Sequence, residues 1–258
     1  MKRSKITILL AIVLGMTFHS CLDLEPQDQL GGKNMWTSVN DYKQFANTFY
    51  SWTRDFSSVV YDGTHSDKRS DLITYQSYNE FSRGINSIPS SDANYTDNYK
   101  HIRRTNLLLQ NAEAYAKPED IKQYIGEAYF FRAYSYFDLL QLYGDVIITK
   151  KPLDITDPEM KVKRNDRSEV VDLIIDDLNH AVENLPAFKE LTTEEEGRIS
   201  KEGAQAFLSR VALYEGTWQK SRNGNQNTQR SANLLDIAAK AARTVIDAKY
   251  GYTFRLFG

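Results

Sequence analysis

The side chains best suited to binding chemistry lie in a long stretch without helical periodicity, residues 57–92. This stretch contains five such residues at irregular spacing: Tyr75, Tyr78, Asn79, Phe81 and Arg83. Aromatic faces can stack on the C–H surface of a sugar ring, and amide and guanidinium groups can hydrogen-bond to its hydroxyls. Long irregular segments in compact domains are often functional, so the pattern indicates a ligand-binding loop. The alternative is that these aromatic side chains pack the loop onto the body of the protein.

The single cysteine of the chain, Cys21, directly follows an export signal. Three basic residues near the amino terminus precede the apolar run 6–18, which matches the charged and hydrophobic regions of a signal peptide. The run has thirteen residues, which is short for a membrane span. Because Phe18-His19-Ser20-Cys21 is similar to a bacterial lipobox, we expect residues 1–20 to be a lipoprotein signal peptide and Cys21 to be lipidated. The alternative is a free thiol inside an uncleaved anchor.

The expected mature chain is acidic. Removing Lys2, Arg3 and Lys5 reduces 32 basic residues to 29, against 34 acidic ones, for a net charge near −5. This balance argues against nucleic acid as a partner. Residues 21–34 begin with an acidic, proline-containing stretch and are interpreted as a solvated tether. With one cysteine, the mature chain has no disulfide framework.

Motifs of the common catalytic centres are absent from the sequence. It contains no GxSxG, no GxxxxGK[ST] and no HExxH. Beyond the signal peptide only His65, His101 and His180 remain, without the spacing of metal ligands. We therefore expect no enzyme, no metal and no cofactor.

The stretch 121–145 is predicted to be one long helix at the centre of the fold. Eight aromatic residues wrap most of its circumference, which is typical of a buried helix. Glu127 falls on a narrow polar strip, whereas Arg132 falls on an apolar face. A buried guanidinium needs carboxylate or carbonyl partners, so Arg132 is interpreted as a structural clamp between helices, with a ligand contact as the alternative.

Further helices are predicted on both sides of this one. Their expected ranges are 35–56, 94–116, 168–185, 200–215 and a last helix that begins at Ser231. Gly216 and Trp218 are expected at the turn of the final pair, followed by a polar insertion over residues 219–230. Small residues on both helices of that pair favour close packing of the tetratricopeptide type. The predicted fold is all-α, with tetratricopeptide-like helix pairs in an α-α superhelix and long irregular loops.

Four segments in order, behind the lipobox-like motif and LDLEP, resemble the successive signatures of the SusD/RagB family. They are GEAYFFRAYSYFDLLQLYGDV, RSEVVDLIIDDLNHAVENLP, RISKEGAQAFLSRVALYEGTW and AAKAARTVIDAKYGY. The resemblance implies an α-helical lipoprotein anchored in the outer membrane by its lipid and facing the cell exterior. It also implies a SusC-like TonB-dependent transporter as partner and a glycan, or in some members a peptide, as ligand.

The family's chains are considerably longer, and this one ends on an apolar segment in the middle of the pattern. We therefore expect residues 35–258 to be the N-terminal part of the family fold. Under the resemblance, the function is capture of polysaccharide or oligosaccharide for uptake. The alternatives are a protein-interaction scaffold, or a remnant that binds no ligand. An exported glycoside hydrolase is disfavoured because no strands hold a pair of carboxylates across a cleft.

Overall fold

The computed structural model describes residues 35–54, 84–85, 87–154, 156–222 and 228–248. The helices in these ranges are α2 (Val39–Asn47), α4 (Ala93–Glu113), α5 (Lys122–Tyr143), α6 (Arg167–Asn184), α7 (Lys201–Arg222) and α8 (Thr228–Asp247). Short 3-10 helices are η1 (Thr48–Trp52), η4 (Pro118–Ile121), η5 (Pro158–Lys161), η6 (Phe188–Glu190) and η7 (Thr193–Glu195). An isolated antiparallel bridge joins Val146 to Asn165. The described part of the chain is thus helical, which confirms the predicted class.

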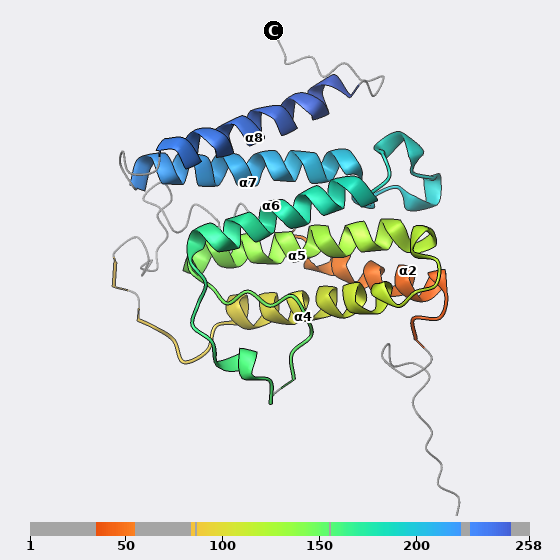
Figure 1. The fold of residues 1–258 in the computed structure, drawn as a ribbon, viewed down its shortest axis with the longest axis horizontal. Helices are drawn as coiled ribbons and strands as arrows, with labels where there is room; N and C mark the ends of the chain where they lie inside the picture. The colour runs from red at the N-terminus through yellow and green to blue at the C-terminus, as the bar shows by residue number, and fades with distance from the viewer. Residues whose placement is uncertain (1–34, 55–83, 86, 155, 223–227, 249–258) are drawn as a thin grey trace, which may run out of the picture. The chain divides into compact units, whose positions relative to one another are not determined.

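Consecutive helices pack against one another, so that α4, α5, α6, α7 and α8 follow in space the order they have in sequence (Figure 1). Short α2 packs beside α5 and α4. Each helix therefore pairs with the one that follows it along the chain, the arrangement of tetratricopeptide-like repeats. The predicted helix pairs are confirmed.

The helix ends carry recognisable caps. Ser38 begins α2 in a capping box, with its hydroxyl accepting from Asp41 N and the Asp41 carboxylate accepting from Ser38 N. Asp92 caps α4 by accepting from Asn94 N, and Asp166 with Glu169 forms a second capping box at α6. At the end of α5, Gly144 has φ of 72°, a left-handed conformation that favours glycine.

Helix α5 lies at the centre of the core, with α2, α4 and α6 around it. Five of its eight aromatic side chains are buried: Tyr124, Phe130, Phe131, Tyr136 and Phe137. At about 2–3 kcal/mol for each large side chain removed from water, this helix is a major source of burial free energy. The expectation of a buried central helix is confirmed, although its α-helical part ends at Tyr143 rather than at residue 145.

Other predicted boundaries were wrong as well; α4, for example, ends at Glu113 rather than at residue 116. The first helix does not continue to residue 56, because α2 tightens into the 3-10 helix η1 after Asn47. Helix α7 runs on through Gly216 and Trp218 to Arg222, so it occupies the start of the predicted insertion 219–230, and α8 occupies the end of that insertion from Thr228. A Cβ on Gly216 would lie only 3.0 Å from Cγ and Cδ2 of Leu235, so this glycine allows α8 to approach closely rather than ending the helix.

Ser231 also has a role other than the predicted cap. Helix α8 begins three residues earlier, at Thr228. The Ser231 hydroxyl is buried and donates to the carbonyl oxygen of Gly216 at 2.8 Å. It therefore ties the two helices together at the point of their close approach.

Candidate functional site

The predicted ligand contacts cannot be placed in the structure. Tyr75, Tyr78, Asn79, Phe81 and Arg83, together with the proposed lipidation site Cys21, lie outside the described residues. The described part of the chain does show the surroundings of Arg132 and two hollows lined by aromatic side chains.

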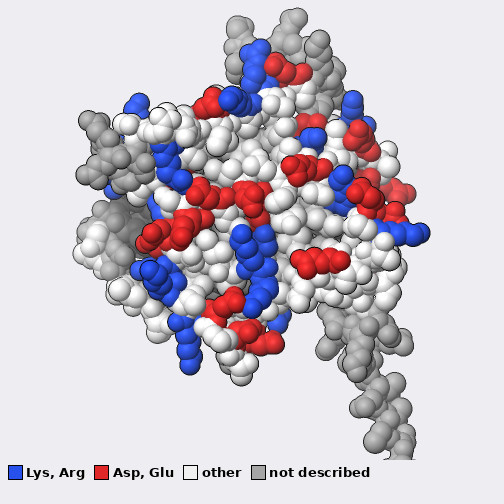
Figure 2. Space-filling model, in the orientation of Figure 1, with Lys and Arg blue, Asp and Glu red and all other residues white. Residues whose placement is uncertain are grey.

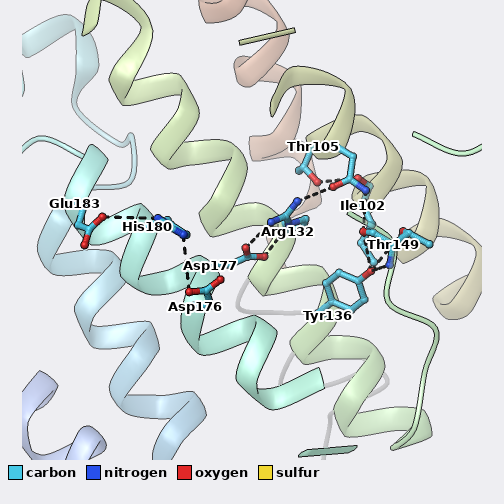
Figure 3. A network of polar contacts seen from close by, with 10 residues as sticks. Ile102, Thr105, Arg132, Tyr136, Thr149, Asp176, Asp177, His180 and Glu183 are labelled. Atoms are coloured by element: carbon cyan, nitrogen blue, oxygen red, sulfur yellow. Dashed lines mark hydrogen bonds and ion pairs between the residues drawn. The ribbon is translucent and has the colours of Figure 1, made fainter. Parts of the chain in front are cut away.

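Arg132 joins three helices. Its Nε and Nη2 donate to the Oδ2 and Oδ1 atoms of Asp177 on α6 at 2.8 and 2.6 Å, and its Nη1 donates to Asn106 Oδ1 on α4 at 2.8 Å. Only 6% of Arg132 is exposed, and Asp177 is fully buried. Figure 3 shows the guanidinium of Arg132 pointing at the carboxylate of Asp177. This is the geometry of an interhelical clamp.

The clamp continues to the segment that follows α5. The side-chain nitrogen of Asn106 donates to the carbonyl oxygens of Thr149 and Lys151, at 2.9 and 3.3 Å. The hydroxyl of Tyr136 accepts from Thr149 N at 2.7 Å and lies 3.2 Å from Thr149 O (Figure 3). The segment therefore lies fixed against α4 and α5.

The electrostatics of the clamp are those of a buried ion pair. Burial opposes the charge of Arg132, but the hydrogen bonds and charge of Asp177 outweigh it and raise the pKa of the guanidinium. Burial raises the pKa of Asp177, and Arg132 acts against this rise. Each charge depends on the other, because an unpaired buried charge is costly.

A second buried pair links α5 to the segment before α7. Arg198 Nε and Nη2 donate to Oε1 and Oε2 of Glu127 at 2.8 and 2.7 Å, and Tyr50 and Tyr124 lie beside the guanidinium. Glu127 is completely buried. In the sequence, Glu127 falls on a predicted polar strip. Its pairing was not predictable, because Arg198 is 71 residues away and not in a helix, so no spacing signals it.

A third pair joins α6 to α7. Arg167 Nε lies 3.2 and 2.9 Å from Oε1 and Oε2 of Glu215, which is fully buried and also accepts from Gln219. The Arg167 guanidinium stacks over the Trp218 ring at 4.0 Å. Bidentate arginine–carboxylate pairs thus hold α5, α6 and α7 to their neighbours.

An aromatic cleft of about 580 Å³ opens between η1, α5 and the start of α7. The half-buried rings of Tyr134 and Phe207 face each other at 5.6 Å, and Phe130 lies 5.4 Å from Phe207. Polar groups border these rings, because Arg54 forms an ion pair with Asp138 across one side of the cleft. Aromatic faces beside charged hydrogen-bonding groups suit a ligand with an apolar face and many hydroxyls. Arg54 is the last described residue before the segment that holds Tyr75.

The surface charge is mixed in sign. Lysine and arginine lie interspersed with aspartate and glutamate over the face shown in Figure 2. Within the described residues, no group of three or more histidine, cysteine, aspartate or glutamate side chains is placed to hold a metal ion. None of the described helices combines the length and the apolar character that a membrane crossing requires.

Comparison with known sequences finds a family model over most of the chain. The SusD-like model, described as "Starch-binding associating with outer membrane", matches residues 22–213. A SusD-like protein of Formosa agariphila is 28% identical over 233 residues, which cover 83% of this chain and 42% of the relative.

Comparison with solved structures agrees. A SusD-like protein of Bacteroides fragilis superposes with a TM-score of 0.66 at 25% identity, over 87% of this chain and 41% of that one. A structure named as a laminarin-binding SusD-like protein has a TM-score of 0.54 at 28% identity, over 69% of this chain and 36% of that one.

The chain spans about two fifths of the length of the first two of these relatives. The family model alone covers more than half of the chain, and the fold superposes on a SusD-like structure. This protein therefore belongs to the SusD-like family, which is described as starch-binding and as associating with the outer membrane.

Proposed function

We propose that this protein is a lipid-anchored glycan-binding protein of the outer membrane that faces the cell exterior. It captures polysaccharide or oligosaccharide and passes it to a SusC-like TonB-dependent transporter for uptake. It needs no cofactor, and catalyses no reaction.

The observation that carries the proposal is the family match over residues 22–213, together with the laminarin-binding relative at 28% identity. The cysteine after an export signal supports the anchor, because a lipid on Cys21 would hold the chain at a membrane without a spanning helix. The mixed surface charge is compatible with a neutral polymer as ligand.

For the ligand contacts we keep the aromatic and polar side chains of the irregular stretch: Tyr75, Tyr78, Asn79, Phe81 and Arg83. Stacking by the three rings would orient the sugar, and the amide and guanidinium would bind its hydroxyls. The cleft with Tyr134 and Phe207 is the alternative location, since it offers the same two kinds of group.

The proposal is tested by calorimetry. The chain, without its signal peptide, is titrated with neutral oligosaccharides, beginning with laminari-oligosaccharide. Binding is expected, and replacing Tyr75, Tyr78 and Phe81 together by alanine should abolish it. Phe207→Ala, at the half-buried ring of the cleft, is the matched comparison and should leave the affinity unchanged.

If Phe207→Ala abolishes binding and the triple variant does not, the cleft is the site and the loop assignment is wrong. Failure of every glycan to bind, with the fold intact by circular dichroism, would contradict glycan capture. A protein-interaction scaffold would then be the better account.

A further inference from the structure

A second hollow, separate from the aromatic cleft, lies between α4 and residues 147–153 with η5; we call it the α4 pocket. Its volume is about 440 Å³, within the range of about 300–1,000 Å³ typical of small-molecule sites. Its apolar wall consists of Tyr95, Tyr99, Ile147, Leu153 and Met160. The rings of Tyr95 and Tyr99 lie 4.8 Å apart. All of its lining residues are among the described ones.

The wall is fixed by hydrogen bonds. The Tyr99 hydroxyl donates to the Ile147 carbonyl oxygen at 2.8 Å, which joins α4 to the segment on the opposite side of the pocket. Tyr95 packs edge-on against Tyr143, whose hydroxyl donates to Asp92 at 2.6 Å. Because these side chains are already held in place, a ligand does not pay the entropic cost of ordering them, which favours binding.

The rim carries three cations, each paired with a carboxylate. Lys151 Nζ lies 2.7 Å from Glu159 Oε1, and Arg103 Nη2 lies 3.8 Å from Asp154 Oδ1. Lys100 Nζ lies 2.8 Å from Asp97 Oδ1. Of these carboxylates only Glu159 lines the pocket, whereas Asp97 and Asp154 neutralise their cations from just outside the lining. The rim therefore offers hydrogen-bond donors and acceptors and carries no net charge.

We propose that the α4 pocket binds a neutral sugar ring, as a subsite for the glycan of the proposed function, on which this inference rests. The tyrosine and aliphatic wall takes the apolar face of the ring. Lys151 and Glu159 at the rim bind its hydroxyls as donor and acceptor. The balanced rim selects against an acidic sugar, because Glu159 repels its carboxylate and the three cations already have carboxylate partners.

The inference is tested by titrating the chain, without its signal peptide, with two neutral ligands, laminari-oligosaccharide and xylogluco-oligosaccharide. Oligogalacturonate of matched length is the acidic comparison. Glu159→Ala and Met160→Ala alter exposed side chains and are expected to fold. Each should weaken binding of the neutral oligosaccharide about fivefold, the effect of one lost contact of about 1 kcal/mol. Val162→Ala, at an exposed apolar residue outside the pocket lining, is the control and should bind as the parent does.

A charge reversal sharpens the test. Glu159→Lys gives the rim an excess of positive charge. This variant should therefore lose affinity for the neutral oligosaccharide and gain affinity for oligogalacturonate. If Glu159→Ala and Met160→Ala bind the neutral oligosaccharide as tightly as the parent does, the α4 pocket is not a sugar site, and the proposed function is unaffected. A preference of the parent for the acidic oligosaccharide would overturn the pocket's selectivity, and absence of binding to any glycan would overturn both proposals.

Discussion

Arg132 on α5 and Asp177 on α6 form a bidentate ion pair with donor–acceptor distances of 2.8 and 2.6 Å, almost fully out of contact with solvent. Asn106 on α4 accepts from the remaining terminal nitrogen of the same guanidinium. A single side chain thus fixes the relative position of three consecutive helices. Breaking the pair leaves a buried charge without its partner, whereas removing both charges does not.

Arg132→Met is therefore predicted to lower the free energy of unfolding by about 3–5 kcal/mol, because Asp177 stays buried without its cation. The double variant Arg132→Met/Asp177→Leu should recover most of that loss. Urea unfolding followed by circular dichroism measures both. Lys240→Met is the control, since Lys240 and Asp236 form an exposed pair and its loss should cost at most about 1 kcal/mol. A double variant less stable than Arg132→Met would contradict this account.

Tyr136→Phe is predicted to destabilise the protein by about 1–3 kcal/mol, because Thr149 N loses the buried hydroxyl that accepts its hydrogen bond. Hydrogen exchange at the Thr149 amide should accelerate more than exchange at the amides within α7. Equal acceleration at both places would show that the hydroxyl acts on global stability and does not hold the segment locally.

The pH dependence of stability should report on His101. Burial lowers the pKa of this imidazole, which stacks on Trp52 at 4.1 Å. Below the unfolded value of about 6.5 the unfolded state binds the proton first, so His101 makes the protein less stable as the pH falls through that window toward its lower folded pKa.

His101→Phe keeps a ring against Trp52 and removes the titration. Its free energy of unfolding should therefore fall less steeply than that of the parent between pH 7.5 and 5.5. His180→Phe is the matched comparison, since His180 also stacks on an aromatic ring, that of Tyr129, but 44% of its side chain is exposed. If the free energy of unfolding depends on pH in the same way in the parent and in His101→Phe, His101 is not the cause of the pH dependence.

Gly216→Leu should separate α7 from α8 and cost about 1–3 kcal/mol or more, the usual range for overpacking. Even the first carbon added at this position would meet Leu235 at 3.0 Å and Leu234 Cβ at 3.3 Å. Thr217→Leu, one residue further along the same helix and exposed, should be tolerated within about 1 kcal/mol. Thermal unfolding of the two variants under the same conditions makes the comparison, and a Gly216→Leu variant as stable as the parent would refute the close approach.

The sequence was enough to predict the helices and their pairing, because those features are periodic. Apolar spacing locates α6, and the density of aromatic residues marks α5 as buried. Arg132 stood out because a charge on an apolar face demands a partner, although nothing in the sequence identified Asp177 as that partner.

Features made by distant residues were not predictable. Glu127 appeared to lie on a polar strip because its partner, Arg198, is 71 residues away in a non-helical segment. Gly216 looked like a helix end because glycine often ends helices, and only the packing of Leu235 explains why it lies within one. The α4 pocket likewise depends on residues from α4 and from the segment after α5, which no local pattern brings together.

The most direct test of the proposed function is recovery of the tagged protein from gently solubilised outer membranes of its host, with the co-purifying proteins identified by mass spectrometry. We expect a SusC-like TonB-dependent transporter in the eluate. In a Cys21→Ala variant we expect the tagged protein, but not the transporter, to be lost from the membrane fraction. A lipidated, membrane-bound protein that repeatedly purifies without any such transporter would contradict the proposed role in uptake.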